Sequence, residues 1–369
     1  MAEIVTRDEM RIEATLPGTA YCDPPVLARE LENIFCRSWL CAGREERVTE
    51  PGDFFTLAVG QESILILRDR DGRLRAFYNV CRHRGTRLCS AEEGHLKGAV
   101  SCPYHAWTYA LDGRLIGTPH LWEGEGFRKE EFSLHPVAID TWGGFLFINL
   151  EGERAAPLAG HLGPIPERNR RYPLAALRLG ARDAHEVECN WKILVENYME
   201  CYHCPGVHPE LCDLVPLYRT GLVDASGSDV IAYFREGACT FTMTGTTRRP
   251  LLSGLDDEEK RKYNGEMIYP TMMLNLFPDY AQYRVLWPLG PARTRIVTEW
   301  LFEPFTMARD DFDASDAIEF IRLVSRQDWS VCELVQKGVA SRAHRHGVYV
   351  PQETHAGQFK AWYLDRLQA

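Results

Sequence analysis

The sequence predicts an α+β fold in which a small all-β domain is inserted near the start. Between about residues 50 and 150, strand-sized apolar runs alternate with the turn signals Asp71-Gly72 and Asp112-Gly113, whereas helical periodicity appears on both sides of this region. The 369 residues are enough for about two or three domains. We expect a helical segment over 1–40, the all-β domain over 41–155 and a larger domain over 156–369.

The first predicted helix, over 24–40, opens at two prolines and carries apolar residues at helical spacing: Leu27, Leu31, Ile34, Phe35 and Trp39. Strands of the all-β region are expected over 54–59, 64–68, 74–80, 106–109 and 145–150. In the last segment, helical patterns are mixed with strands. The helices are expected over 190–204, 314–337 and 354–368, and two of the strands over 283–287 and 295–302.

The composition argues against several classes of function. The formal charge is −10, and no basic stripe suits a nucleic acid. The longest apolar runs are strand-sized, far below the roughly 18–20 residues that span a bilayer, so no membrane partner is expected. Residues 1–9 are acidic and lack the apolar stretch of a signal peptide. We therefore expect a cytoplasmic protein whose 12 cysteines are buried thiols or metal ligands rather than disulfides.

Two Cys-plus-His pairs lie in the all-β region, Cys81-x-His83 and Cys102-x-x-His105. This pattern places two thiolates and two imidazoles at the tips of two neighbouring loops. Such a set suits either zinc or a [2Fe–2S] cluster with two histidines on one iron. The spacing lacks the short two-cysteine knuckles of zinc ribbons, which favours the cluster.

A second set of candidate ligands surrounds the helix predicted over 190–204. Glu200 and His203 are three residues apart and are expected to share a helix face, while Pro205-Gly206 lets His208 turn back toward the same point. Asp328 falls on the apolar stripe of a later helix, where a carboxylate is costly unless a cation neutralises it. Two histidines and one carboxylate leave non-haem Fe(II) open to dioxygen. A buried Asp–Arg pair, or a helix register shifted by one residue, is the alternative.

Both sets resemble known motifs. Residues 79–85 and 101–107 resemble the Rieske [2Fe–2S] site of oxygenase α subunits. The triplet Asn190-Trp191-Lys192, followed by Glu200-x2-His203-x4-His208 and later by Gln327-Asp328-Trp329, resembles the mononuclear-iron segments of the same Rieske non-haem iron oxygenases, the ring-hydroxylating superfamily. The resemblance runs through most of the chain, and the two motifs occur in the family order.

The resemblance implies an all-β Rieske domain inserted in a helix-grip (START-like) catalytic domain with an antiparallel sheet. It implies a [2Fe–2S] cluster, mononuclear Fe(II) and dioxygen as co-substrate. The implied cluster ligands are Cys81, His83, Cys102 and His105, and the implied iron ligands are His203, His208 and Asp328. It also implies a homotrimer in which electrons pass from the cluster of one subunit to the iron of its neighbour. No G-x-G-x-x-G follows a strand, so a separate NAD(P)H-dependent flavin/iron-sulfur reductase is the expected partner.

In the family that this chain resembles, the carboxylate that bridges two subunits is Asp in most members, and the resemblance places Glu200 at that position. Glutamate at this place resembles the carnitine and glycine-betaine monooxygenase branch. Glu200 is therefore expected to bond His203 and, across the interface, a cluster histidine (83 or 105). Asn197 is a candidate pocket residue, and Cys201 and Cys204 are expected to be packing thiols.

This branch favours mono- or dioxygenation of a small organic substrate, with oxidative N-demethylation of a quaternary ammonium compound as the main expectation. An aromatic and sulfur-rich wall would suit a methylammonium group through cation–π attraction, or equally an aromatic ring. Hydroxylation of an aromatic ring or aromatic acid is therefore the alternative, and a Rieske electron carrier without oxygenase activity is a more distant one. The expected substrate-binding residues are Phe241, Met243, Met273, Phe277 and Tyr283.

Overall fold

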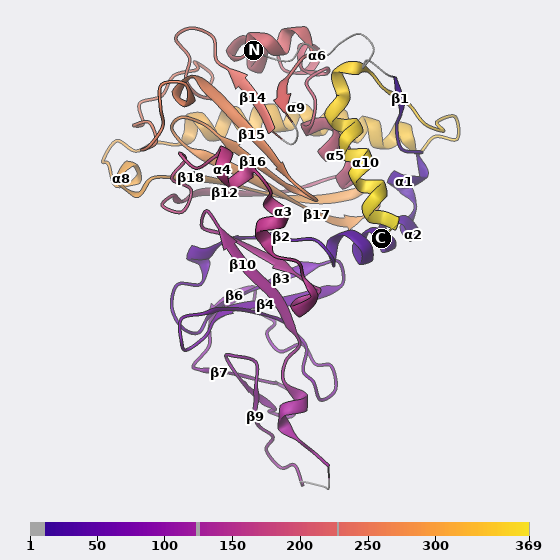
Figure 1. Ribbon diagram of the computed structural model, residues 1–369, viewed down its shortest axis with the longest axis vertical. Helices are drawn as coiled ribbons and strands as arrows, with labels where there is room; N and C mark the ends of the chain where they lie inside the picture. The colour runs from indigo at the N-terminus through magenta and orange to yellow at the C-terminus, as the bar shows by residue number, and fades with distance from the viewer. Residues whose placement is uncertain (1–11, 123–125, 227–228, 369) are drawn as a thin grey trace. The chain divides into compact units, whose positions relative to one another are not determined.

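The computed structural model describes residues 12–122, 126–226 and 229–368 (Figure 1). The chain forms two compact units. One comprises Phe35–Gly163, and the other joins the residues up to Ile34 to those from Pro164 onward. Within the described residues, no helix combines the length and the apolar character needed to cross a membrane.

The unit Phe35–Gly163 is an antiparallel β structure. In the part of the chain that is described, its larger sheet runs in the order β2 (Leu40–Arg44), β11 (Phe145–Asn149), β10 (Pro136–Trp142), β5 (Leu74–Tyr78), β4 (Glu62–Arg68), β3 (Asp53–Val59) and β6 (Glu93–His95). A smaller sheet joins β7 (Ala99–Ser101), β8 (Thr108–Ala110) and β9 (Leu115–Gly117), and α3 (Leu158–Leu162) ends the unit. The four residues from Ile64 to Leu67 are completely buried, so β4 is covered on both faces.

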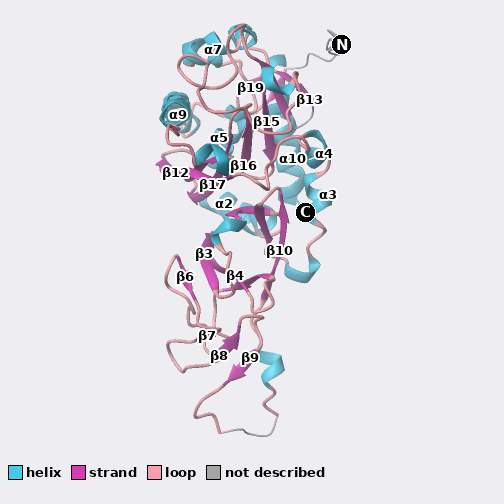
Figure 2. Cartoon of the chain, turned by 90° about the vertical axis from the view of Figure 1, so that its left-hand side faces the viewer, coloured by secondary structure: helices cyan, strands magenta, loops and turns pink. Residues whose placement is uncertain are grey.

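The other unit is built on a second antiparallel sheet. Its described strands run in the order β12 (Arg178–Val187), β18 (Arg293–Phe302), β17 (Ala281–Gly290), β16 (Met272–Leu276), β15 (Lys262–Ile268), β14 (Asp229–Tyr233) and β13 (Asp224–Ser226). The long helix α9 (Ser315–Val339) covers one face of this sheet and is seen nearly end-on beside β12 and β17 in Figure 2. Its Phe320 and Ile321 share a buried cluster with Trp300 and Phe302 of β18.

Shorter helices complete this unit. They are α1 (Thr19–Cys22), α2 (Pro24–Glu30), α4 (Ile165–Arg168), α5 (Trp191–Tyr198), α6 (Cys204–Val207), α7 (Pro209–Leu214), α8 (Pro304–Met307) and α10 (Thr354–Gln368). A two-stranded ladder pairs β1 (Glu13–Ala14) with β19 (Val348–Tyr349). The predicted α+β class with antiparallel sheets is confirmed, and α9 and α10 begin and end within two residues of the predicted helices.

The helix predicted over 24–40 is too long. The α-helix ends at Glu30, a π-helical turn spans Leu31–Phe35, and Leu40 already begins β2. The strand forms because all five residues of β2 are buried and four of them pair with β11, with a bulge at Ala42. Trp39 lies outside the helix, and its indole N–H donates to the carbonyl of Ala156 at 2.8 Å.

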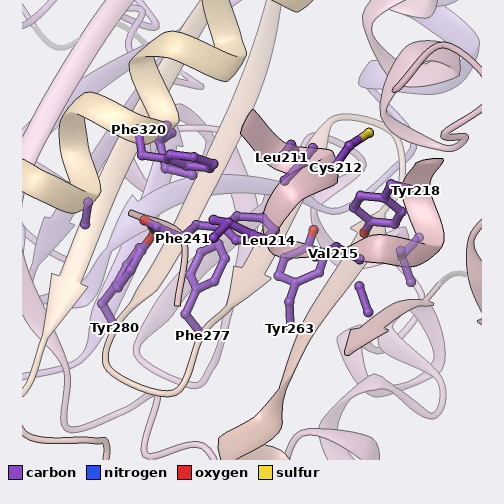
Figure 3. Close-up of a cluster of buried hydrophobic side chains, with 14 of the residues drawn as sticks. Leu211, Cys212, Leu214, Val215, Tyr218, Phe241, Tyr263, Phe277, Tyr280 and Phe320 are labelled. Carbon is purple, nitrogen blue, oxygen red and sulfur yellow. Dashed lines mark hydrogen bonds between the residues drawn. The ribbon is translucent and has the colours of Figure 1, made fainter. Parts of the chain in front are cut away.

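Aromatic side chains fill the space between α9 and the sheet. Phe320 of α9 points toward Phe241, with ring centroids 5.6 Å apart (Figure 3). The ring of Phe241 stacks on Tyr263 at 5.2 Å and contacts Phe277 at 5.0 Å. This cluster forms the floor on which the site described below is built.

A buried ion pair connects three helices of the same unit. Lys192 of α5 lies 2.5 Å from the carboxylate of Glu30 on α2, and both side chains are completely buried. The same carboxylate accepts the indole N–H of Trp191 at 2.8 Å and the hydroxyl of Tyr363 on α10 at 2.7 Å. Asn190 caps α5 by accepting the backbone N–H of Lys192. The Asn190-Trp191-Lys192 triplet thus fixes the start of the helix that leads to the site.

Candidate active site

Three side chains from separate parts of the chain converge on one point. The ligand atoms of His203, His208 and Asp328 all lie within 4.8 Å of one another. The Nε2 atom of His208 is 2.8 Å from Oδ1 of Asp328, and the Nε2 atom of His203 is 3.4 Å from the same oxygen. Two imidazoles and one carboxylate form the donor set of mononuclear non-haem iron sites that keep positions open for dioxygen.

The local chain path differs from the predicted one. α5 ends at Tyr198, so Glu200 and His203 lie in the loop after the helix and do not share a helix face. The reason is that the Glu200 carboxylate accepts the backbone N–H groups of Tyr202 and His203, which a continuing helix would have bonded to the carbonyls of Tyr198 and Met199. The short helix α6 then separates the two histidines, and the Pro205-Gly206 step lies inside it.

The second nitrogen of each imidazole is held by a hydrogen bond. His203 Nδ1–H donates to Glu200 Oε1 at 2.6 Å, and His208 Nδ1–H donates to Gln327 Oε1 at 2.8 Å. The amide of Gln327 is oriented in turn, because its Nε2 donates to Glu210 at 2.9 Å. These two bonds favour the neutral tautomer with its proton on Nδ1, in which the lone pair of each Nε2 faces the convergence point and can bind a metal.

The electrostatics of this point favour a cation. Burial lowers the pKa of His203, but hydrogen bonds and charge from Asp328 and Glu200 outweigh it and raise the pKa to about 10. Burial likewise raises the pKa of Asp328, yet the two histidines hold that pKa well below its usual range. Positive charge is therefore strongly stabilised between these groups, as a divalent iron requires.

A cavity opens beside the three ligands. Its wall includes the predicted residues Asn197, Phe241, Met273 and Phe277, and Asn197 Nδ2 lies 3.3 Å from Nε2 of His203. Other wall residues were not predicted: Tyr198, Tyr218, Tyr263, Asn275, Gln282 and Arg284. The polar members of this set lie on strands. They were missed because the wall was predicted from aromatic and sulfur-containing side chains.

Two predicted substrate-binding residues lie elsewhere. The side chain of Met243 is 58% exposed and does not line the cavity. Tyr283 is buried on the opposite face of the sheet, where its hydroxyl donates to Glu299. The reason is the alternation of β17: since Gln282 and Arg284 face the cavity, the residue between them must face away.

Cys201 and Cys204 also differ from their prediction as separate packing thiols. They are joined by a disulfide that flanks His203, and both residues are buried. Both line the cavity. The bond closes the loop between α5 and α6, which carries the first histidine.

The other unit brings the four predicted cluster ligands together on two matching loops. Cys81 N–H donates to Thr86 and Cys81 C=O accepts from Gly85; Cys102 makes the corresponding bonds with Trp107 and Ala106. Gly85 and Ala106 occupy the same place in the two turns, and both have positive φ angles, +73° and +55°. The two loops therefore have one backbone design despite their different spacing.

The side chains on these loops face one another. The rings of His83 and His105 lie edge to face with centroids 4.6 Å apart, and Trp107 stacks on His83 at 4.8 Å. Cys81 and Cys102 belong to one buried cluster with side chains of β3, β4 and β5, so the large sheet supports both loops. His83 itself is exposed.

These residues fit a Rieske cluster. The Nδ1 atom of His105 is buried and has no hydrogen-bond partner among the described residues, which leaves it available to a metal. Burial raises the pKa of the Cys102 thiol, but backbone N–H groups of Tyr104 and His105 and contacts with Cys81 lower it overall, which favours the thiolate. A pair of thiolates and a pair of neutral imidazoles is the Rieske donor set.

Comparison with known proteins agrees with this geometry. A model of the Rieske [2Fe–2S] domain matches residues 38–128, and a model described as the ring hydroxylating alpha subunit (catalytic domain) matches residues 174–369. The chain belongs to the family of Rieske ring-hydroxylating oxygenase α subunits. Members of this family are oxidoreductases that use dioxygen with a [2Fe–2S] cluster and a mononuclear iron, and these are the cofactors of this chain. The zinc alternative for the first ligand set is therefore wrong.

Known relatives align with nearly the full length of this chain. The glycine betaine monooxygenase oxygenase subunit of Pseudomonas aeruginosa is 30% identical over 96% of this chain and 89% of its own length. The carnitine monooxygenase oxygenase subunit of Acinetobacter baumannii is 33% identical over 90% of this chain and 86% of its own. The crystal structure of the quaternary ammonium Rieske monooxygenase CntA with L-carnitine superimposes with a TM-score of 0.76 at 30% identity, covering 96% of this chain and 95% of that one.

Proposed function

We propose that this oxygenase hydroxylates a methyl group of a small quaternary ammonium compound and so removes it as formaldehyde. The observation that carries the proposal is the convergence of His203, His208 and Asp328 beside a cavity with an aromatic wall. The names of the relatives, which act on glycine betaine and carnitine, support the same substrate class. In the overall reaction, one oxygen atom enters the C–H bond, and the other leaves as water with two electrons from a reductase and two protons from solvent.

In this proposal, His203, His208 and Asp328 hold the iron, which when bound supplies the activation of dioxygen. Glu200 and Gln327 keep the two imidazoles in the protonation state that a metal needs, through the hydrogen bonds to their Nδ1 atoms. The hydroxylated carbon lies next to nitrogen, and its C–N bond breaks to give the amine and formaldehyde.

The chain's own contribution to substrate binding is the aromatic wall. The rings of Phe241, Tyr263 and Phe277 are buried and contact one another at 5.0–5.2 Å. Ring faces attract a methylammonium group and exclude water around it. The same wall accepts an aromatic ring, so hydroxylation of an aromatic substrate is the competing function.

We also propose that Rieske electrons reach the iron between subunits of a homotrimer in the cytoplasm. Glu200 supports this route because it bonds His203 directly and is not completely buried. The exposure of His83 at its loop tip would allow the matching contact on a neighbouring copy. A separate NAD(P)H-dependent flavin/iron-sulfur reductase would supply the cluster with electrons.

The test uses the iron-loaded protein with an added reductase and measures formaldehyde from glycine betaine, L-carnitine and choline. Formaldehyde in amounts matching the oxygen consumed is expected from at least one compound, and none from the His203→Ala variant. Oxygen uptake with an aromatic acid, and no formaldehyde from any methylammonium compound, would replace this proposal by aromatic hydroxylation. No substrate-dependent oxygen uptake at all would favour the electron-carrier alternative.

A further inference from the structure

Two hydrogen-bond donors on β17 face the cavity without acceptors. Gln282 and Arg284 are two residues apart on the strand and both line the cavity. The Nε2 atom of Gln282 and the Nε atom of Arg284 are buried, and neither has a hydrogen-bond partner among the described residues. Buried donors are nearly always paired in native proteins, so two unpaired donors on one wall of a cavity indicate a missing acceptor.

The side-chain NH₂ group of Gln282 lacks an acceptor because of the direction in which a chain of hydrogen bonds runs. The hydroxyls of Tyr198 and Tyr263 donate to Oδ1 of Asn275, at 3.0 and 2.5 Å. The amide of Asn275 is thereby oriented, and its Nδ2 donates to Oε1 of Gln282 at 2.5 Å. Because Gln282 receives this bond on its oxygen, its NH₂ group is left to bind something else.

Arg284 is a cation without a counter-ion. One of its nitrogens, Nη2, donates to the hydroxyl of Ser325 at 2.6 Å, and that hydroxyl donates to the carbonyl of Ile321. Within the described parts of the chain, no carboxylate forms an ion pair with Arg284, and Asp328 acts on it only from a distance. Burial lowers the pKa of this guanidinium by more than the charge of Asp328 raises it.

A fixed positive charge in the cavity also constrains the substrate. A quaternary ammonium ion without a negative group would add a second cation to a site that already holds a guanidinium with no ion-pair partner among the described residues. A carboxylate would accept from the guanidinium and from the amide at once, as charge-assisted hydrogen bonds. The wall therefore offers an aromatic surface for a methylammonium group and a separate pair of donors for an anion.

We propose that Arg284 and Gln282 bind the carboxylate of the substrate, so that the preferred compounds are zwitterionic betaines and not cations such as choline. This inference rests on the proposed function for the location of the substrate, which is the cavity beside His203, His208 and Asp328. Arg284 and Gln282 are specificity-determining residues in this scheme, and Ser325 and Asn275 position them.

The test measures binding and turnover separately in the reconstituted holoenzyme. Calorimetry gives the Kd of glycine betaine, choline and benzoate, and formaldehyde release gives kcat and KM. Arg284→Gln is expected to raise the Kd of glycine betaine by about 10- to 100-fold, as loss of a charge-assisted hydrogen bond does. The Kd of choline should stay the same or fall, because the repulsion between two cations is removed. Arg295→Gln, an exposed arginine on β18, is the matched control and should change neither value.

Two further variants keep the test independent of folding defects. Arg284→Lys preserves the charge and should retain more affinity for glycine betaine than Arg284→Gln. Gln282→Glu places a carboxylate beside Arg284 and should weaken glycine betaine while the melting temperature stays at or above that of the parent. Equal effects of these variants on glycine betaine and choline would overturn the carboxylate assignment even if both compounds are demethylated.

The outcome also separates this inference from the proposed function. If no methylammonium compound yields formaldehyde, but benzoate binds and Arg284→Gln weakens it at least tenfold, the carboxylate site stands and N-demethylation fails. If choline is the better substrate of the parent protein, the carboxylate site fails and N-demethylation stands.

Discussion

Glu200 and His203 are tied to each other twice: the carboxylate accepts the Nδ1–H of the imidazole at 2.6 Å and the backbone N–H of the same residue at 3.2 Å. One side chain thus fixes both the ring orientation of a candidate iron ligand and the turn that carries it. The two contacts use different oxygens, Oε1 for the imidazole and Oε2 for the backbone N–H. An amide in this place has one acceptor oxygen, so it can hold the imidazole but loses the charge and the bond to the backbone.

Glu200→Gln is expected to retain both metal centres and to slow turnover by about 10- to 100-fold, because the charge that raises the basicity of His203 is lost. Iron analysis and the rate of substrate-dependent oxygen uptake measure the two effects. Turnover at the parental rate would remove the electron-transfer role proposed for Glu200.

His203→Ala is expected to remove the mononuclear iron and leave the Rieske cluster in place, since the two ligand sets lie in different units of the chain. Metal analysis should fall from about three irons per chain to about two, with the EPR signal of the reduced cluster unchanged. The complementary variant, Cys102→Ser, should abolish that signal. Loss of the signal in His203→Ala would show that the two sets do not load independently.

The buried pair of Lys192 and Glu30 predicts a large stability effect. Lys192→Met leaves the Glu30 carboxylate buried without its cation and should lower the free energy of unfolding by about 3–5 kcal/mol. The double variant Lys192→Met/Glu30→Leu should recover part of this loss. Urea unfolding followed by circular dichroism measures both, and a single variant as stable as the parent would contradict the expectation.

Glu196 predicts a pH dependence of stability. Burial raises its pKa from 4.5 to about 7, against hydrogen bonds from Tyr21 and Tyr349 and the charge of Lys192, while the charge of Glu353 adds to the rise. The folded state then holds a proton that the unfolded state has released between about pH 4.5 and 7. The stability contributed by this proton is complete below pH 4.5 and is lost as the pH rises through 7, by up to about 3 kcal/mol.

Glu196→Gln should therefore reduce the loss of stability between pH 5 and pH 8 relative to the parent. Urea midpoints at the two pH values give the difference. Glu319→Gln, which changes an exposed glutamate on α9, serves as the control and should leave the pH dependence as it is. An unchanged slope in Glu196→Gln would show that this carboxyl ionises normally.

The features that could be predicted are those that depend on the spacing of residues within one segment of the sequence. The long helix α9 could be predicted because apolar residues recur at helical spacing from Ala317 to Cys332, and Asp328 lies on the same face. The two Cys-plus-His pairs could be predicted as metal ligands because cysteine and histidine seldom occur together in such a pattern for another reason. In both cases the residue type and the local period carry the information.

The unpredicted part depends on contacts between distant segments. α5 ends early because Glu200 replaces the helical carbonyls as acceptor, which no helix propensity indicates. The phase of β17, which turns Tyr283 away from the cavity and Arg284 toward it, is fixed by pairing with β16 and by the cover of α9. A charged residue inside a strand pattern gives no sign of which face it occupies until the neighbouring strands are known.

The link from Glu210 through Gln327 to His208 has a consequence for assembly of the active site. It ties the start of α7 to the middle of α9, so two of the three metal ligands are gathered by protein contacts alone. The binding energy of the ion is then not needed to bring His208 and Asp328 together. After a chelator removes the mononuclear iron, the site should therefore stay formed. Adding a ferrous salt should refill it completely without any need to unfold and refold the protein.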